Sequence, residues 1–183
     1  MSLMDDCIGQ APILVLAVGN PSRGDDAFGP LLAQQLQSWL ATQTTEVQQA
    51  IELITDQQLV VEHALDLRGR EQVLFIDAAA QHDAPVALRA VTPSPSNHAP
   101  ARVNSHRSTP DDLLALYQSL LSQPPPQADL LTLTGHGFEL GAPLSDTAQA
   151  LLPQAWKLLQ GWLDQALAHA LAAATNTERA GHA

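Results

Sequence analysis

The stretch that most constrains this chain is an apolar run followed at once by a tight turn and two acids. The run, Ile13 to Val18, has the length and the β-branched content of a buried strand. Four turn-forming residues interrupt the chain next: Gly19, Asn20, Pro21 and Gly24. Asp25 and Asp26 follow, and the amphipathic segment from Phe28 to Leu40 predicts a helix. The acids therefore lie where a strand leads into a helix. In an open α/β sheet, this carboxyl edge of the strands is where ligands bind.

The two acids allow different interpretations. Either Asp25 or Asp26 could be the N-cap of the helix, a role worth about 1 kcal/mol, with the other adding a favourable charge at the helix dipole. Alternatively, the pair binds a cation. A phosphate loop is excluded because the stretch matches neither GxGxxG nor GxxxxGK[ST], and adjacent carboxylates repel phosphate.

Strand and helix patterns alternate through the rest of the chain. Further strands are predicted at Glu46–Ile54, Gln72–Ile76, Val86–Val91 and Ala128–Thr134. Further helices are predicted from the turn at Thr55–Gln58 to about Leu67, at Pro110–Leu121, and from Ser145 to about Ala174 with Pro153 kinking or restarting it. This order predicts an α/β protein: a three-layer α/β/α sandwich whose mostly parallel, twisted sheet has about five strands and helices on both faces. We expect one domain, residues 1–174, and a disordered tail, residues 175–183.

Composition excludes several classes of protein. The 183-residue chain has a formal net charge of −11, which argues against a nucleic-acid partner. Cys7 is the only cysteine, so an intramolecular disulfide and a cysteine-based zinc site are both excluded. The first residues lack the pattern of a signal peptide, and no uncharged stretch reaches the ~20 residues of a membrane span. We therefore expect a cytoplasmic protein without membrane insertion.

Acids and histidines follow several predicted strands or precede a predicted helix. They are Asp25, Asp26, Asp77, His106 and His136. In a doubly wound sheet all of these positions lie at the carboxyl edge, so their side chains could converge. Two carboxylates and one neutral imidazole suit a borderline divalent metal such as zinc or nickel.

Each of these residues also has a simpler interpretation. Asp77 could cap the turn after its strand, His106 could be a surface residue, and His136 could pack against Phe138. Four further histidines are expected to be solvated: His63, His82, His98 and His169.

Other catalytic chemistries find little support in the sequence. There is no GxSxG motif, and no helix carries histidines at positions i and i+4. A Ser-His-Asp set could be assembled from Ser108, His106 and several acids, but no pattern specifies it.

The ordered motifs resemble those of the hydrogenase maturation proteases, endopeptidases that trim the C-terminus of the [NiFe]-hydrogenase large subunit after nickel insertion. The segment GNPSRGDDAFGP is similar to the family signature GN-x-x-x-x-D-[DE]-x-x-G. The supporting segments are QQLVVEHALDL, FIDAA, SHRSTPDDLLAL and GHGFELGAPLS. The resemblance covers roughly Ile13 to Trp162 and implies a hydrolase of the aspartic-type endopeptidase class.

The resemblance also implies a metal site. The family's ligand positions fall on Asp26, Asp77 and His106, which are also the candidates for catalytic roles. The metal implied is nickel, supplied by the large-subunit precursor that is the expected partner. Zinc or another divalent metal could occupy the site in vitro.

Other positions of the resemblance carry weaker implications. Asp25 would shape or cap the loop, and Asn20 and His136 are candidates for substrate binding. The segment TDQQL departs from the DGGT-type turn of some members. Two other functions share parts of the pattern: a non-catalytic chaperone that binds the metallocentre, and a nucleotide-binding α/β protein.

Overall fold

A five-stranded sheet forms the centre of the computed structural model, which describes residues 10–79, 84–95 and 108–180. The strands lie in the order β2 (Ile51–Asp56), β1 (Ile13–Val18), β3 (Gln72–Ala79), β5 (Gln127–Thr134) and β4 (Val86–Val91). The first four are parallel, and β4 pairs antiparallel with β5. The prediction of a mostly parallel sheet is therefore confirmed.

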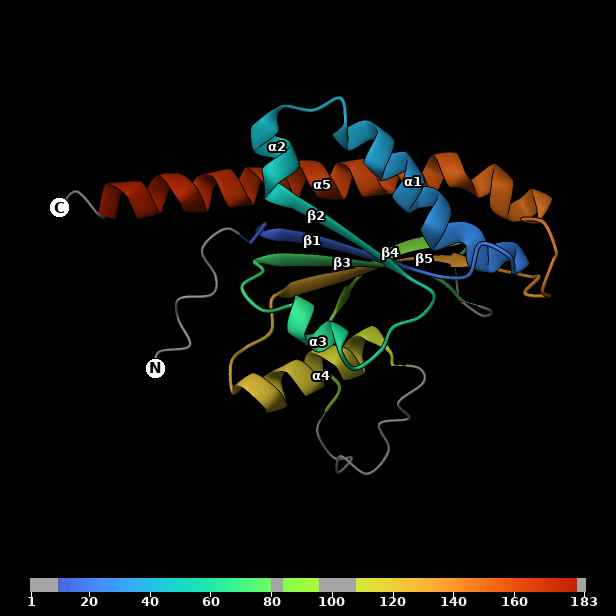
Figure 1. Cartoon of the computed structure of the whole chain (residues 1–183), viewed down its shortest axis with the longest axis horizontal. Helices are drawn as coiled ribbons and strands as arrows, with labels where there is room; N and C mark the ends of the chain where they lie inside the picture. The colour runs from blue at the N-terminus through green and yellow to red at the C-terminus, as the bar shows by residue number, and fades with distance from the viewer. Residues whose placement is uncertain (1–9, 80–83, 96–107, 181–183) are drawn as a thin grey trace.

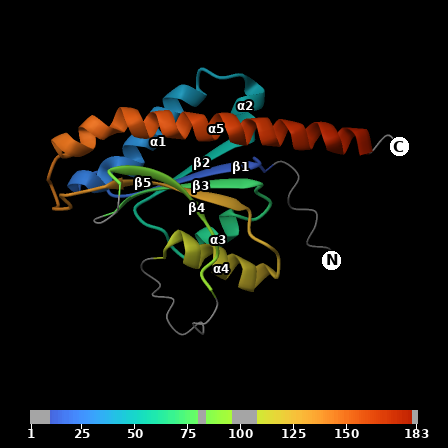
Figure 2. The same cartoon turned by 180° about the vertical axis from the view of Figure 1, so that it is seen from behind.

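Helices cover both faces of this sheet, as the two opposite views show (Figures 1 and 2). One face carries α1 (Phe28–Leu40), α2 (Thr45–Ala50) and α5 (Asp146–Ala180), and the other carries α3 (His63–Asp66) and α4 (Pro110–Leu121). The predicted three-layer α/β/α sandwich is confirmed. It places the carboxyl ends of β1, β2, β3 and β5 along one edge.

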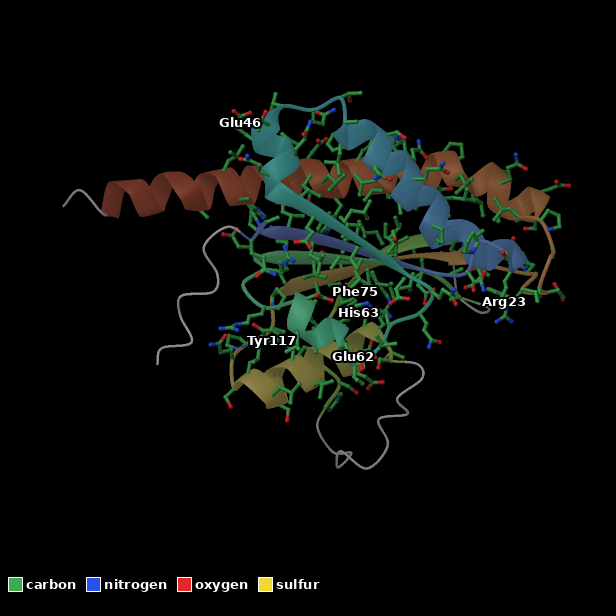
Figure 3. The ribbon with its side chains drawn as sticks, in the orientation of Figure 1. Arg23, Glu46, Glu62, His63, Phe75 and Tyr117 are labelled. Atoms are coloured by element: carbon green, nitrogen blue, oxygen red, sulfur yellow. The ribbon has the colours of Figure 1, made fainter. Side chains whose placement is uncertain are left out.

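The core consists of two apolar clusters, one on each face of the sheet. All six residues of β1 are buried, and alternate side chains join opposite clusters: Val15 packs on the α1 and α5 side, and Leu16 on the α3 and α4 side. Phe75 and Tyr117 belong to the second cluster and lie between the sheet and α4 (Figure 3). Burial on both faces explains why the parallel strands read as continuous apolar runs in the sequence.

Two elements around β2 differ from the sequence prediction. The strand expected at Glu46–Ile54 begins only at Ile51, because Thr45–Ala50 forms the helix α2. That segment is rich in Glu, Gln and Ala, which favour a helix. The helix expected up to Leu67 is reduced to the four residues of α3, since β2 continues to Asp56 and a turn precedes His63.

The helices in the second half of the chain follow the prediction more closely. Helix α4 has the predicted bounds, with Pro110 at its first position and the Thr109 hydroxyl accepting the Asp112 N–H at 3.3 Å. Helix α5 contains Pro153 without ending there and continues past Ala174 to Ala180, so the tail predicted from residue 175 is helical to that point. In the described part of the chain, no helix is long and apolar enough to cross a membrane.

Candidate active site

The turn between β1 and α1 is shaped by glycines that no other residue can replace. Gly19 has a φ of +142°, and a Cβ there would lie 2.0 Å from the carbonyl oxygen of Asp26. Gly24 has a φ of +56°, and a Cβ there would lie 2.5 Å from the carbonyl oxygen of Gly137. This close packing allows one 3₁₀ turn, η2 (Gly24–Ala27), to carry both acids at the edge of the sheet.

Asp25 points away from solvent and joins three segments of the chain. Its Oδ1 accepts the Ser145 N–H at 2.8 Å, and its Oδ2 accepts the N–H groups of His136 and Gly137 at 2.8 and 3.3 Å and the Ser145 hydroxyl at 3.0 Å. Burial opposes ionisation of this carboxyl, but these hydrogen bonds outweigh it and lower its pKa below the ordinary value. Asp25 is therefore ionised, and its hydrogen bonds hold η2 against the segment after β5 and the start of α5.

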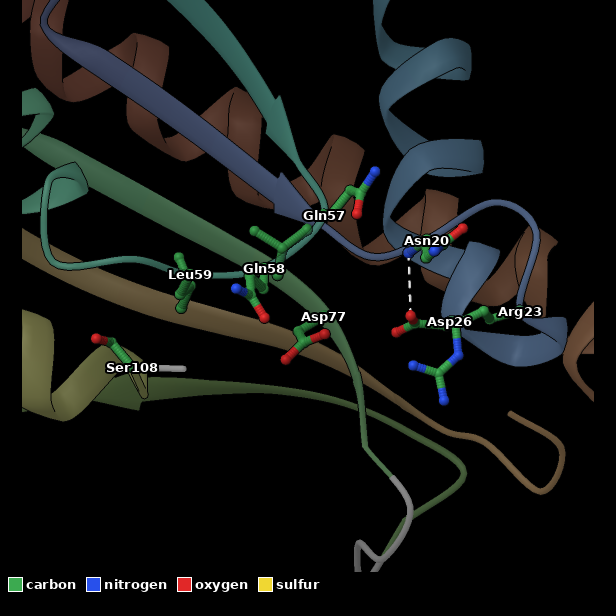
Figure 4. Close-up of a pocket in the computed structure, with 9 residues that line it drawn as sticks. Asn20, Arg23, Asp26, Gln57, Gln58, Leu59, Asp77 and Ser108 are labelled. Carbon is green, nitrogen blue, oxygen red and sulfur yellow. Dashed lines mark hydrogen bonds between the residues drawn. The ribbon is translucent and has the colours of Figure 1, made fainter. Parts of the chain in front are cut away.

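Asp26 points to the other side of the turn, into a cavity of about 140 Å³ that Asp77 also lines. Figure 4 shows the two carboxylates reaching the same hollow, one from the β1–α1 turn and the other from β3. The Asn20 N–H donates to Asp26 Oδ2 at 3.0 Å, and the Ala78 N–H donates to Asp77 Oδ1 at 2.8 Å. In each acid, a main-chain N–H group therefore binds one carboxylate oxygen and orients the side chain.

The N-cap interpretation of the two acids is wrong. The N-cap of α1 is Ala27, and it makes no side-chain capping bond. Both acids lie within η2, before α1 begins, and the Asp26 side chain lines the cavity instead of capping the helix.

The remaining cavity wall comes from three other segments. Gln57, Gln58 and Leu59 follow β2, and the Leu59 carbonyl accepts the N–H of Ser108, which lines the cavity beside it. The Arg23 side chain completes the wall beside Asp26 and donates from Nε to the Phe138 carbonyl at 3.1 Å (Figure 4). The cavity therefore combines two carboxylates, amides, a hydroxyl and one guanidinium group.

Of the predicted metal ligands, the structure brings Asp26 and Asp77 together. His106 lies outside the described residues, as do His82 and His98. Within the described ranges, no group of three or more His, Cys, Asp or Glu side chains is placed to hold a metal ion. The three-residue metal site stays a prediction.

The two candidates for substrate binding lie in different surroundings. Asn20 lines the cavity, whereas His136 is exposed and does not line it, and its main-chain N–H binds Asp25. Both roles stay predictions.

The prediction that His63 is solvated is wrong. His63 is only 5% exposed and lies in α3 below the sheet (Figure 3). Its Nδ1 accepts the Val60 N–H at 3.1 Å, so its Nε2, 3.5 Å from Asp56 Oδ2, carries the proton in the neutral ring. These contacts fix the turn that follows Gln57, Gln58 and Leu59, the residues that form one wall of the cavity. The hint of burial in the sequence was the apolar residues at helical spacing on either side, Leu59 four positions before His63 and Leu67 four positions after it.

Several solved structures share this fold. An endopeptidase that matures hydrogenase, HybD from Escherichia coli, superposes with a TM-score of 0.61 at 20% sequence identity, over 84% of this chain and 92% of its own. The [NiFe] hydrogenase maturation protease HycI from Thermococcus kodakarensis gives 0.60 at 19% identity, over 89% and 99%. A hydrogenase 2 maturation peptidase from a Thaumarchaeota archaeon gives 0.55 at 21% identity, over 82% and 97%.

These similarities establish that the chain has the fold of the hydrogenase maturation proteases, as its motifs predicted. The superpositions span nearly the whole length of the compared proteins. No protein-family model and no curated protein matches the sequence.

Proposed function

We propose that this protein is an endopeptidase that removes the C-terminal extension of a [NiFe]-hydrogenase large-subunit precursor. The observation that carries the proposal is the pair Asp26 and Asp77 in one cavity at the carboxyl edge of the sheet, on a fold shared with maturation endopeptidases. The sequence around the acids matches no phosphate-binding motif, and the two carboxylates favour a cation. Nickel already seated in the precursor is the cation that the proposal assigns to it.

Asp26 and Asp77 would contact the nickel of the loaded precursor directly. The hydrogen bond from Asn20 engages Oδ2 of Asp26, which leaves Oδ1 to face a ligand in the cavity. Carboxylate oxygens with an imidazole form a donor set that suits a borderline divalent metal. The proposal therefore needs a third ligand, and His106 supplies the imidazole.

Covalent geometry supports the assignment of His106. Ser108 lines the cavity, and an extended chain spans at most about 3.6 Å per residue, so the Cα atoms of residues 106 and 108 are separated by no more than about 7 Å. The proposal assigns the third ligand position to the imidazole attached there. Binding through the precursor's own nickel would restrict cleavage to the loaded precursor, because an empty one lacks the ion that holds it in place.

The other polar groups would position the peptide. Arg23 is held by the Phe138 carbonyl at the rim and presents a cation where a peptide carbonyl or carboxylate can bind. Gln57 and Gln58 add amides that can pair with a peptide main chain. Attack on the scissile bond requires a water molecule, and the carboxylates are the available bases in the cavity.

The test is a cleavage assay on the nickel-loaded precursor, in which mass spectrometry follows the loss of the extension. We expect wild type to cleave and Asp26→Asn, Asp77→Asn and His106→Ala to lose at least about 10²-fold in kcat/KM, the range expected for a group acting on the reacting centre. Asp164→Asn is the control, because this exposed acid of α5 lies outside the cavity. Circular dichroism verifies that each variant is folded.

The outcomes separate the candidate functions. If wild type binds the loaded precursor and never cleaves it, the protein is a chaperone for the metallocentre. If wild type cleaves nickel-loaded and nickel-free precursors equally well, nickel recognition is wrong although the protease activity stands.

A further inference from the structure

A second hollow lies next to the acidic cavity, between α1 and the outer edge of the sheet. It is open to solvent and has a volume of about 450 Å³. Its walls include Pro21, Ala33, Gln34, Gln37, Leu53 and Thr55. Gln57 lines both this hollow and the acidic cavity, so the two adjoin at the end of β2.

Strand β2 is an edge strand with β1 as its neighbour in the described part of the sheet. The Asp56 carbonyl accepts the Gly19 N–H at 3.0 Å and therefore faces β1. Because main-chain groups point to alternate sides along a strand, those of Leu53 and Thr55 face outward. Within the described residues, no hydrogen bond outside the sheet engages the main-chain groups of these two residues.

The outer edge of β2 and the second hollow thus form one surface. Leu53 and Thr55 present N–H and C=O groups at the edge, and their side chains also line the hollow. An edge of this kind pairs with an extended peptide through main-chain bonds, while pockets beside it receive alternate side chains.

We infer that the C-terminal extension of the precursor binds here as an added strand on β2, with alternate side chains in the hollow. The inference rests on the proposed function, which supplies the peptide. It goes beyond that function by naming the surface that holds the extension. A peptide lying along β2 would reach the acidic cavity at Gln57, where cleavage would take place.

The chemistry of the hollow favours this occupant. Apolar surface of Ala33 and Leu53 forms part of its lining, and the amides of Gln34 and Gln37 lie beside it. Asp56 is the one charged residue among the described residues that line it, so uncharged or basic side chains fit best. A second copy of the chain is disfavoured, because two molecules with a net charge of −11 repel each other.

The first test is Thr55→Pro. Proline lacks the outward N–H and blocks strand addition, whereas the bonds to β1 come from the neighbouring residues Ile54 and Asp56. We expect KM for the precursor to rise at least about tenfold, as for loss of a main-chain bond with added steric conflict, and kcat to change by less than about twofold. Thermal melting verifies that the variant is folded.

The matched control is Thr45→Pro, the same exchange at another exposed threonine. Thr45 is the first residue of α2, and Thr44 before it is extended, so proline fits there. We expect wild-type KM and kcat for this variant. Equal impairment by both prolines would overturn the inference.

The second test leaves wild type unchanged and uses a synthetic peptide with the sequence of the extension. NMR-detected amide exchange should show at least about tenfold slower exchange at Leu53 and Thr55 when the peptide is added. The Ile54 amide, which faces β1, should exchange at the same rate with and without peptide.

The outcomes separate this inference from the proposed function. If Thr55→Pro cleaves the precursor with the wild-type KM, the edge does not hold the extension, although protease activity stands. If wild type cleaves no precursor, the exchange measurement decides alone: slower exchange at Leu53 and Thr55 supports the edge site, and unchanged exchange overturns it. A wild-type dimer that Thr55→Pro dissociates would assign the edge to a second copy and overturn the inference.

Discussion

The variant Asp25→Asn removes one charge from a buried carboxylate and should destabilise the fold strongly. Asp25 Oδ2 accepts three hydrogen bonds and Oδ1 accepts one. An asparagine at this position has one oxygen and one NH₂ group. If its oxygen replaces Oδ2, its NH₂ group faces the Ser145 N–H, and two donors meet.

The magnitude follows from these contacts. An unpaired buried N–H costs about 1–3 kcal/mol. The remaining bonds lose the assistance of the negative charge, which roughly halves their strength and adds about 1 kcal/mol or more. We therefore expect Asp25→Asn to lower the free energy of unfolding by about 3 kcal/mol at pH 7.

The assay is urea denaturation of wild type, Asp25→Asn and the control Asp164→Asn, which removes the same charge from an exposed helical position. The lowered pKa of Asp25 also sets the pH dependence. Its stabilisation is complete above the unfolded-state pKa, about 4, and is lost as pH falls through the folded-state pKa. The gap between wild type and Asp25→Asn should be constant from pH 7 to about 5 and shrink below about pH 4.

A loss below about 1 kcal/mol, or one equal to that of Asp164→Asn, would refute the reasoning, since it would mean that the four bonds contribute no more than a surface charge. A gap that widens toward low pH would refute the assigned sign of the pKa change. Either result would show that the Asp25 carboxylate does not hold η2 against the start of α5.

Three further predictions concern the scaffold, and urea denaturation checks each. Gly29→Ala should destabilise by more than about 2 kcal/mol although alanine is the better helix former, because its Cβ would lie 2.1 Å from the Val18 carbonyl oxygen. Arg70→Met should lower the free energy of unfolding by about 3 kcal/mol, because the buried guanidinium donates to Ala11, Asp66 and Glu52. The same exchange at the exposed Arg89 is the control and should lower it by less than about 0.5 kcal/mol. Trp162→Phe should cost about 1 kcal/mol through loss of the 2.9 Å bond to Asp129, and an unchanged midpoint would contradict this.

The sequence predicted the central strands well because a parallel sheet imposes a strong pattern. β1, β3 and β5 are covered on both faces, so each reads as an apolar run between polar segments. The segments around β2 gave a weaker signal, because an edge strand needs less apolar surface. Leu59, Ala64 and Leu67 have helical spacing and do share one cluster, but a turn before α3 brings them together instead of a continuous helix.

The residues of the cavity also divide into those that the strand pattern predicts and those that it does not. Asp77 directly follows the strand predicted at Gln72–Ile76 and lies near the carboxyl end of the longer β3, so the topology of the sheet was sufficient to predict its place at the carboxyl edge. Arg23 and Ser108 reach the cavity through the paths of loops, and the Arg23 contact to Phe138 spans 115 positions in the sequence. Local patterns contain no information about such contacts. The sequence therefore singled out the two acids and Asn20 of the cavity, and it missed Arg23, Gln57 and Gln58.

The Asp25–Asp26 pair shows why adjacent acids should be interpreted separately. Successive residues of a 3₁₀ turn are separated by about 120° around its axis, so the two side chains of η2 must point in different directions. Asp25 lies against the segment after β5, where main-chain N–H groups satisfy its charge, and Asp26 lies in the cavity. Like charges on neighbouring residues are tolerable here because one of them is fully hydrogen-bonded. The buried acid thereby fixes the turn that presents the other, so removing Asp25 should disturb the position of Asp26 even though Asp25 itself does not line the cavity.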